Sequence, residues 1–228
     1  MNAIILCGGL STRLGEITKS APKVLLDIKG KTVLDWQLEK LREFGIKEVV
    51  LAAGHLSDIL KKEVGANRNG IKIIYAVEKE KLGTGGAIKF AWNNFVSRPE
   101  EPVVILNGDI LAKAKLSDMA GCLRPESEGE ILGSKVEDAS PYGTLKFDAN
   151  RHLLSFKEKE GKKQAGHING GIYIFTSAVK KYFPKQNAFS VEYDVFPKMK
   201  NLDVYPSDDG WVDIGVPERL GWARKFWD

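Results

Sequence analysis

The residues with the most obvious chemistry stand near the amino terminus, in a loop that holds two cations. Arg13 and Lys23 follow an apolar run at 3–7 and the glycine pair Gly8 and Gly9. Glycines let a backbone approach a phosphate group closely, and a guanidinium and an ammonium group neutralise its charge. The loop lacks the GxGxxG spacing of dinucleotide-binding folds and the GxxxxGK spacing of P-loops. These residues alone therefore leave a phosphate site and an ordinary tight turn about equally open.

Two aspartates supply the matching anionic chemistry. Asp109 ends the hydrophobic run ILNGD, and Asp213 stands between apolar neighbours in WVDIG, just before a predicted helix. Magnesium prefers oxygen ligands and often bridges carboxylates to substrate phosphates. A turn residue and a helix cap are the simpler interpretations of the two aspartates. Because they lie far apart in the sequence, spacing alone does not pair them.

The first half of the chain alternates between strand and helix patterns, and this alternation would position the loop and Asp109. Runs rich in Ile and Val predict buried strands, at 3–7, 48–53, 71–77 and 102–106. Helices are predicted between them, at 32–44, 57–63 and 83–95. The alternation predicts an α/β fold with a doubly wound, Rossmann-like mixed sheet. Ligands of such sheets bind at the carboxyl ends of the strands.

The pattern changes after Asp109. Shorter and more polar runs predict a meander of antiparallel strands at 130–136, 144–147 and 152–157. We expect them to form a small antiparallel subdomain that packs against the sheet. The remaining elements predicted are a strand at 172–175 and helices at 178–183, 191–199 and 217–227.

Composition bounds the class of protein. The 228 residues are 43% hydrophobic and 28% charged, with a net charge of +4. These values predict one globular domain and give no reason to expect a nucleic acid partner. Two cysteines without metal or disulfide spacing fit a reducing compartment, and no run is long enough for a membrane span. We expect a cytoplasmic protein without a membrane partner, and the sequence leaves open whether it forms a homodimer.

The order of the motifs carries a resemblance to a known family. LCGGLSTRL, PK, KLGTGGAI, NGD, YG, EK, NGGIY and WVDIG follow one another over nearly the full chain. In this order they resemble the sugar-phosphate nucleotidyltransferase family, whose members join a nucleoside triphosphate to a sugar 1-phosphate and release pyrophosphate. The resemblance implies the nucleotide-diphospho-sugar transferase type of fold, Mg²⁺ as cofactor, and a nucleoside triphosphate and a sugar 1-phosphate as partners. It also implies a single domain at 1–228, with 1–112 mainly binding nucleotide and 113–228 mainly binding sugar phosphate.

The same resemblance implies roles for individual residues. Arg13 and Lys23 would neutralise the triphosphate, and Asp109 and Asp213 would hold magnesium, so these four are the expected catalytic residues. The expected nucleotide-binding residues are Leu6, Gly8, Gly9, Ser11, Thr12, Arg13, Lys23, Glu78, Gly83, Thr84, Gly85, Asn107 and Asp109. The expected sugar-phosphate-binding residues are Tyr142, Gly143, Glu158, Lys159, Asn169, Gly170 and Glu192. Asp194 shares a predicted helix with Glu192 but faces another way, so at most one of the two is expected to contact sugar.

Glu78 bears on the choice of base. Its position resembles the one that meets the Watson-Crick edge in the family, where a carboxylate can accept from both N1–H and N2–H of guanine. Uracil offers one donor there, N3–H, so GTP is favoured. The alternative is a solvated glutamate in the charged run EKEK.

The subfamily is predicted from the short chain and three motifs. LGTGGAI, INGGIY and FSVEYD are most similar to D-glycero-D-manno-heptose 1-phosphate guanylyltransferases. Mannose 1-phosphate guanylyltransferases, and uridylyltransferases acting on N-acetylmuramate or glucose 1-phosphate, stay open as alternatives. A regulatory nucleotide-sugar-binding domain is the alternative that is not an enzyme, and the presence of all four expected catalytic residues argues against it.

The opening loop also departs from the family pattern AGGxGTRLxPxT. Cys7, Ser11 and Glu16 stand where that pattern has Ala, Gly and Pro. We expect Cys7 to be a small buried side chain rather than a reactive thiol. Nothing in the sequence explains Glu16.

Overall fold

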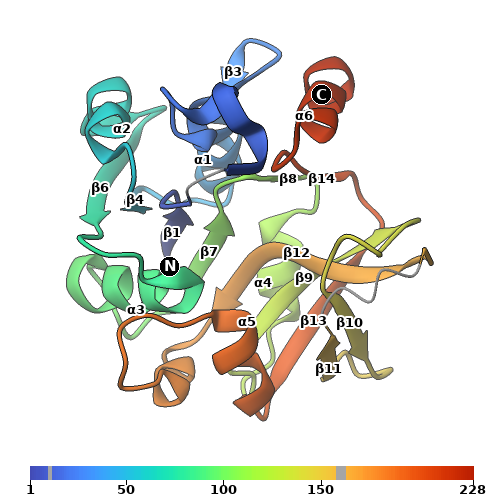
Figure 1. The fold of residues 1–228 in the computed structure, drawn as a ribbon. Coiled ribbons are helices and arrows are strands. Elements are labelled where there is room, and N and C mark those ends of the chain that lie inside the picture. The colour runs from blue at the N-terminus through green and yellow to red at the C-terminus, as the bar shows by residue number, and fades with distance from the viewer. Residues whose placement is uncertain (10–11, 158–162) are drawn as a thin grey trace.

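The computed structural model describes residues 1–9, 12–157 and 163–228. Four parallel strands form the first half of a ten-stranded sheet, in the order β6, β4, β1, β7 (Figure 1). Their bounds are Asn2–Leu6 for β1, Glu48–Ala53 for β4, Ile71–Val77 for β6 and Val103–Asn107 for β7. The helices between them are α1 at Val33–Glu43, α2 at Ser57–Val64 and α3 at Gly83–Phe95. The prediction of a doubly wound α/β sheet is therefore confirmed.

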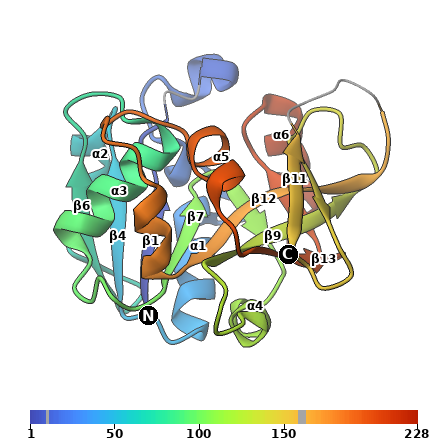
Figure 2. The ribbon, with the colours of Figure 1, turned by 90° about the horizontal axis from the view of Figure 1, so that it is seen from below.

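Helices cover both faces of this sheet, which buries its strands. Leu34, Leu38 and Leu41 of α1 lie on one helical stripe and pack against one face. Ile88 and Trp92 of α3 pack against the opposite face, on which α3 lies in Figure 2. Burial on both faces explains why the strands are continuous apolar runs rather than alternating ones.

Local signals set the bounds of α1. Thr32 caps the helix, because its hydroxyl accepts from the Asp35 N–H at 3.1 Å while the Asp35 carboxylate accepts from the Thr32 N–H at 3.1 Å. Gly45 follows the last turn with a φ of 90°, a conformation that glycine adopts without steric cost. These contacts fix the helix that supports the site described below.

The second half of the chain extends the same sheet. β12 pairs antiparallel with β7 through residues 172–175, and it also pairs with β9 and β10. The predicted meander is wrong in this respect, because β12 lies between β9 and β10 instead of following them. The bounds are Gly129–Val136 for β9, Thr144–Phe147 for β10, Leu153–Lys157 for β11, Gly166–Phe175 for β12 and Leu202–Ser207 for β13, which is parallel to β9. β10 and β11 lie at the far end of the molecule from β6 (Figure 1).

Two short strands next to the carboxyl terminus were not predicted. β8 at Ile110–Ala112 and β14 at Trp211–Asp213 form an antiparallel pair of their own, beside α6 at Pro217–Phe226. Strands of three residues carry too little pattern to be recognised in a sequence. The pair joins the end of β7 to the carboxyl-terminal segment.

The predicted helix at 191–199 is split. α5 covers Val191–Asp194, and a separate 3₁₀ turn, η4, covers Phe196–Lys198. Pro197 explains the break, because proline has no N–H to donate and its ring clashes with the preceding turn. The other elements are η1 at Thr12–Thr18, η2 at Lys23–Leu25, β2 at Asp27–Ile28, β3 at Lys31–Thr32, β5 at Asn67–Arg68, α4 at Leu116–Cys122 and η3 at Ser177–Tyr182. No helix among the described residues is long and apolar enough to cross a membrane.

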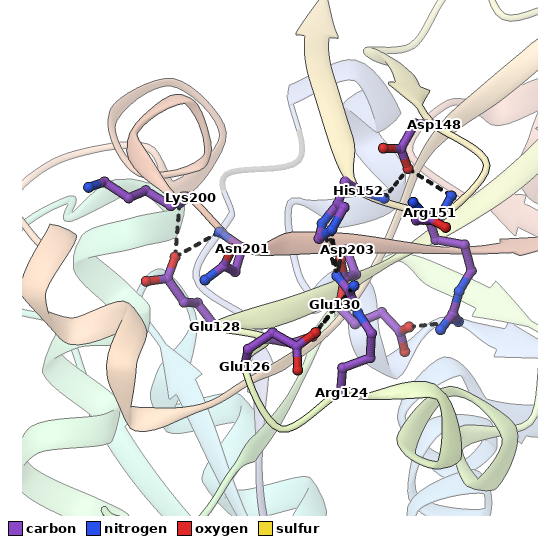
Figure 3. Close-up of polar contacts among 12 residues, drawn as sticks. Arg124, Glu126, Glu128, Glu130, Asp148, Arg151, His152, Lys200, Asn201 and Asp203 are labelled. Carbon is purple, nitrogen blue, oxygen red and sulfur yellow. Dashed lines mark hydrogen bonds and ion pairs between the residues drawn. The ribbon is translucent and has the colours of Figure 1, made fainter.

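A charged cluster holds β13 to the turn that precedes β11 (Figure 3). Asp203 of β13 is fully buried and accepts from Arg124 Nη2 at 2.6 Å, and from the hydroxyl of Ser127. His152 Nδ1 lies 3.0 Å from the same carboxylate. A buried carboxylate with this many donors is compensated for its loss of water.

Glu130 of β9 lies opposite Asp203 in the β9–β13 ladder and is also fully buried. Its Oε1 is 3.3 Å from Arg151 Nη1, and its Oε2 has no hydrogen-bond partner among the described residues. Burial raises the pKa of Glu130 to about 7, and the neighbouring Asp203 raises it too, although Arg151 and Arg124 oppose the shift. Desolvation therefore outweighs the ion pair.

Glu130 should make the stability of the protein depend on pH. Its pKa is about 7 in the folded chain against an ordinary value of 4.5, so between these values the folded state binds more protons than the unfolded state. The free energy of unfolding should then fall, by at most about 3 kcal/mol from this group, as the pH rises through that window. In urea unfolding measured from pH 4.5 to 8, the free energy of unfolding of a Glu130→Gln variant should no longer decrease in this way. The control is Glu126→Gln, which removes an exposed carboxylate that pairs with Arg124 and should keep the wild-type dependence of stability on pH. An equal decrease of the unfolding free energy with pH in wild type and Glu130→Gln would refute the assignment.

Candidate active site

The carboxyl ends of the four parallel strands meet in a cavity of about 290 Å³. The loop after β1, the residue after β6, the start of α3 and the turn after β7 all line it. The cavity brings together most of the predicted nucleotide-binding residues: Leu6, Gly8, Gly9, Lys23, Glu78, Gly83, Thr84, Asn107 and Asp109. A ligand at this edge would lie where open α/β sheets bind nucleotides.

Close contacts favour glycine at two positions of the cavity lining, Gly8 and Gly108. A Cβ on Gly8 would lie 3.0 Å from Glu78 Oε1, and a Cβ on Gly108 would lie 2.4 Å from the Leu6 carbonyl oxygen. The Gly108 N–H donates to that same oxygen at 3.0 Å. The absence of side chains therefore lets the loop after β1 fit between Glu78 and the turn after β7.

Lys23 and Asp109 form one charged pair of the site. Lys23 Nζ lies 2.8 Å from Asp109 Oδ2, and both side chains are partly buried. Lys23 opens the 3₁₀ turn η2, and Asp109 stands in the turn between β7 and β8. Residues that are far apart in the sequence are thus joined directly.

Asp213 belongs to a second pair. Its Oδ2 accepts from Arg219 Nη2 at 2.7 Å, and Arg219 Nε donates to the Asp213 carbonyl at 2.7 Å. Its Oδ1 accepts from the Gly215 N–H at 2.5 Å. The Ile214 N–H donates to the Asp109 carbonyl at 2.9 Å, which makes the backbones of the two aspartates neighbours. The structure therefore makes Asp109 and Asp213 neighbours along the backbone, which spacing alone did not, and their joint role at a metal stays a prediction.

Arg13 lies on the Asp213 side of the site rather than beside Lys23. Both Arg13 and Asp213 lie against Gly215. If Gly215 carried a Cβ, that carbon would lie 3.4 Å from Arg13 Nη2 and 2.6 Å from Asp213 Oδ1. Arg13 is exposed, so its guanidinium is accessible from solvent. Lys23 thus pairs with Asp109, whereas Arg13 lies next to Asp213.

The predicted sugar-phosphate residues adjoin this second pair. Tyr142 packs edge-on against Trp211 with ring centroids 5.2 Å apart, and the Arg219 guanidinium lies 5.3 Å from the Tyr142 ring centroid. Trp211 Nε1 donates to the Gly170 carbonyl at 2.9 Å. Burial raises the pKa of Tyr142, so the phenol stays protonated at neutral pH.

Asn169 and Gly143 complete this group. The Asn169 N–H donates to the Gly143 carbonyl at 3.0 Å, and Asn169 Nδ2 donates to the Tyr173 hydroxyl at 3.0 Å. Gly171 has a φ of 69°, and a Cβ there would lie 2.9 Å from Asn107 Nδ2. The strand that carries the predicted sugar residues therefore runs directly against the predicted nucleotide site.

Glu192 and Thr84 lie together, although they were predicted for different substrates. The Thr84 hydroxyl donates to Glu192 Oε2 at 2.6 Å, and the Ser190 hydroxyl donates to the same oxygen at 2.6 Å. Asp194 instead accepts from the Ser190 N–H at 2.9 Å, within its own segment. Of the two carboxylates on α5, Glu192 is the one that reaches the start of α3.

Gly85 lies behind the cavity rather than in its lining. Its N–H donates to the Phe189 carbonyl at 3.0 Å, and a Cβ there would lie 2.3 Å from a Phe189 ring carbon. The contact with nucleotide predicted for Gly85 stays a prediction, and the contacts observed are with the loop before α5. The contacts predicted for Ser11, Glu158, Lys159 and the side chain of Thr12 lie outside the described residues.

Burial raises the pKa of two groups in the cavity wall. Burial raises the pKa of Glu78, although the Leu82 N–H, which donates to Glu78 Oε2 at 3.2 Å, opposes the shift. Burial also raises the pKa of the Cys7 thiol far above its usual range, so this sulfur is neutral and a poor nucleophile. The structure thus agrees with the prediction that Cys7 is a small buried side chain.

Arg219 was missed in the sequence analysis. It stands in the first turn of α6, and the short spacing from Asp213 to this arginine in WVDIGVPERL was the available signal. A helix that begins beside a carboxylate places its first-turn side chains within reach of that carboxylate. The structure also adds Trp211, which contacts Tyr142 and Gly170.

These features, an α/β sheet with a glycine-lined cavity and paired aspartates and cations at its edge, agree with comparisons to known proteins. Residues 2–227 match the family described as Nucleotidyl transferase, and the chain belongs to this family of enzymes. It is 41% identical to D-glycero-alpha-D-manno-heptose 1-phosphate guanylyltransferase of Campylobacter jejuni, over 96% of each chain. It is 35% identical to the mannose-1-phosphate guanylyltransferase catalytic subunit beta of Drosophila pseudoobscura, but spans only 59% of that protein.

A solved structure is similar over almost the whole chain. The HddC protein of Yersinia pseudotuberculosis, solved in complex with GMP-PN, gives a TM-score of 0.85 at 31% identity, with 98% of both chains covered. The resemblance to sugar-phosphate nucleotidyltransferases inferred from the motifs is therefore confirmed at the level of family and fold. Membership of an enzyme family also argues against the regulatory-domain alternative.

Proposed function

We propose that this enzyme transfers GMP from GTP to D-glycero-α-D-manno-heptose 1-phosphate, forming a GDP-heptose and pyrophosphate. The observation that carries the proposal is the 41% identity to the Campylobacter jejuni heptose 1-phosphate guanylyltransferase over 96% of both chains. The cavity supports it, because nucleotide-binding and sugar-binding candidates lie on adjoining strands.

The chain's own residues have distinct parts in the proposed reaction. The glycine loop after β1 admits the triphosphate to the cavity, and Lys23 beside Asp109 and Arg13 beside Asp213 offset its charge. An oxygen of the sugar phosphate attacks the α-phosphorus in line, the bond from the α-phosphorus to its bridging oxygen breaks, and pyrophosphate leaves with that oxygen. A phosphate oxygen is already nucleophilic at neutral pH, so no covalent enzyme intermediate is required. Positioning and charge neutralisation are then the main contributions of the protein.

The two aspartates fit a magnesium ion. Among the described residues no group of three or more His, Cys, Asp or Glu side chains is placed to bind a metal ion, so protein side chains alone would not complete the coordination shell of Mg²⁺. Magnesium typically binds one or two carboxylates and completes its shell with substrate oxygens and water. Asp109 and Asp213, whose backbones are neighbours, would supply two such carboxylates. When bound there, magnesium would supply positive charge next to the α-phosphate.

Base choice in the proposal rests on Glu78. Its carboxylate is half-buried beside Gly8, and Oε2 already accepts from the Leu82 N–H. Each carboxylate oxygen has two acceptor positions, so both oxygens keep capacity for the donors of guanine. The GMP-PN complex of the Yersinia pseudotuberculosis protein supports a guanine nucleotide for this chain too.

A substrate panel tests the proposal. Pyrophosphate release should be measured for GTP, ATP, CTP and UTP against heptose, mannose, glucose and N-acetylmuramate 1-phosphates. We expect GTP with the heptose phosphate to give the highest kcat/KM, by about tenfold or more over every other pair of nucleotide and sugar phosphate. Preference for mannose 1-phosphate would favour the alternative that the Drosophila pseudoobscura relative suggests, and failure of GTP with every sugar would overturn the choice of nucleotide.

Removal of the metal is a separate test. Excess EDTA should abolish the reaction, and added Mg²⁺ should restore it.

A further inference from the structure

Gln37 of α1 is a buried polar residue that the catalytic roles described so far do not use. Its side chain is only 3% exposed, and Nε2 donates to two backbone carbonyls, those of Asn107 at 2.8 Å and Ile110 at 2.9 Å. These carbonyls are the two ends of the turn that joins β7 to β8. Gly108 and Asp109 form the middle of that turn, so the amide of Gln37 closes it from behind.

The chemistry of the partners fixes the orientation of this amide. Carbonyl oxygens only accept hydrogen bonds, so the NH₂ group of Gln37 must face them, and both of its hydrogens are used. The other end of the amide, Oε1, is buried and has no hydrogen-bond partner among the described residues. Burying an unpaired acceptor costs about 1–3 kcal/mol. A methionine of similar length would avoid that cost, so what glutamine adds at this position is its pair of donors.

The other supports of the turn come from β1, from the residue after β14 and from η2. The Gly108 N–H donates to the Leu6 carbonyl of β1 at 3.0 Å, and the Ile214 N–H donates to the Asp109 carbonyl at 2.9 Å. The Asp109 carboxylate itself is held by Lys23 at 2.8 Å. Gln37 is the support that comes from a helix, and it binds both ends of the turn at once.

We propose that Gln37 is a positioning residue that holds the Asp109 carboxylate at its working position. The inference rests on the proposed function for its effect on rate, but not for its effect on the turn. Without Gln37 the carbonyls of Asn107 and Ile110 lose their buried donors, and the turn gains freedom to shift. A displacement of about 1 Å at a reacting centre can cost about 100-fold in rate.

The test compares Gln37→Met with a matched control on the same helix. Lys40 lies one turn further along α1, and its Nζ donates to the Ala114 carbonyl at 2.7 Å, beyond β8 and away from Asp109. Lys40→Met therefore removes a similar contact between a side chain of α1 and the backbone without touching the turn. Each variant and the wild type should be measured for kcat, for KM of GTP, for midpoint of thermal unfolding, and for amide hydrogen exchange of peptides covering 103–112.

We expect Gln37→Met to lower kcat by about 10- to 100-fold with little change in KM, and to speed exchange at 107–110. Lys40→Met should keep the wild-type kcat and the slow exchange of the turn. Wild-type exchange of the turn in Gln37→Met would overturn the proposal, and so would a parallel loss of kcat and thermal stability in both variants. If the wild type transferred no nucleotide at all, the proposed function would fail, while the exchange measurement would still decide whether Gln37 orders the turn.

Discussion

Replacing Asp109 by asparagine should lower kcat by about 10²- to 10³-fold, the range typical of removing one preorganised electrostatic group. Asparagine has almost the same shape and keeps one oxygen, so the turn after β7 should keep its backbone contacts. What is lost is the negative charge, which in the proposed reaction holds Mg²⁺ and which in the structure pairs with Lys23 at 2.8 Å. The ammonium group of Lys23 would then lose the carboxylate with which it forms its ion pair.

The measurement is steady-state release of pyrophosphate over a range of Mg²⁺ concentrations, because a weakened metal site should need more Mg²⁺ for half-maximal rate. Asp58→Asn is a suitable control, since Asp58 is an exposed carboxylate in the first turn of α2. It should behave as wild type. Unchanged kcat and Mg²⁺ dependence in Asp109→Asn would remove Asp109 from the proposed metal site.

The second large effect is expected for Arg13→Ala. The guanidinium lies next to Gly215 and Asp213, whereas the ammonium of Lys23 is paired with Asp109, so the two cations act at different carboxylates. Charge on the phosphates is redistributed as pyrophosphate departs, and a cation that favours this change stabilises the transition state more than the bound substrates. We expect kcat to fall by about 10²-fold or more, with a smaller change in the KM of GTP.

Two further variants make the result for Arg13 specific. Arg13→Lys keeps the charge but loses the planar fork of donors, so its kcat should lie between those of wild type and Arg13→Ala. Arg42→Ala removes an exposed arginine from α1 and should have no effect. A wild-type kcat for Arg13→Ala at saturating substrates would show that Arg13 takes no part in the chemical step.

The sequence was most informative where pattern and burial coincide. α3 was predicted at 83–95 and β4 at 48–53, with the bounds observed, because both are long apolar segments with clear ends. The second half was harder, since β12 pairs with three strands and β9 pairs with a strand far along the chain. Such pairings are fixed by packing over long sequence distances, and local propensity carries little information about them.

The site shows the same division. The glycine loop, Lys23 and Asp109 follow strands in the sequence, so a rule about strand ends could place them together. Arg219 and Gln37 are ordinary helix residues in the sequence, and the structure places Arg219 against Asp213 and Gln37 against the turn that carries Asp109. The spacing from Asp213 to Arg219 was a local signal for the first of these contacts, whereas no local pattern predicts that Gln37 faces the carbonyls of Asn107 and Ile110.

The junction between β7 and β12 has a consequence for protein engineering. Val103 to Leu106 are hydrogen-bonded in register with residues 172–175, and Gly171 lies against Asn107 just beyond them. A division of the chain near residue 112 therefore cuts through one continuous sheet and does not release two modules. Exchanging residues 113–228, the half predicted to bind sugar phosphate, for that of a relative would require a donor whose β12 matches this register and keeps a glycine at 171. If the proposed sugar contacts of Tyr142 and Asn169 hold, single substitutions around them are a better route to a new sugar specificity than chimeras.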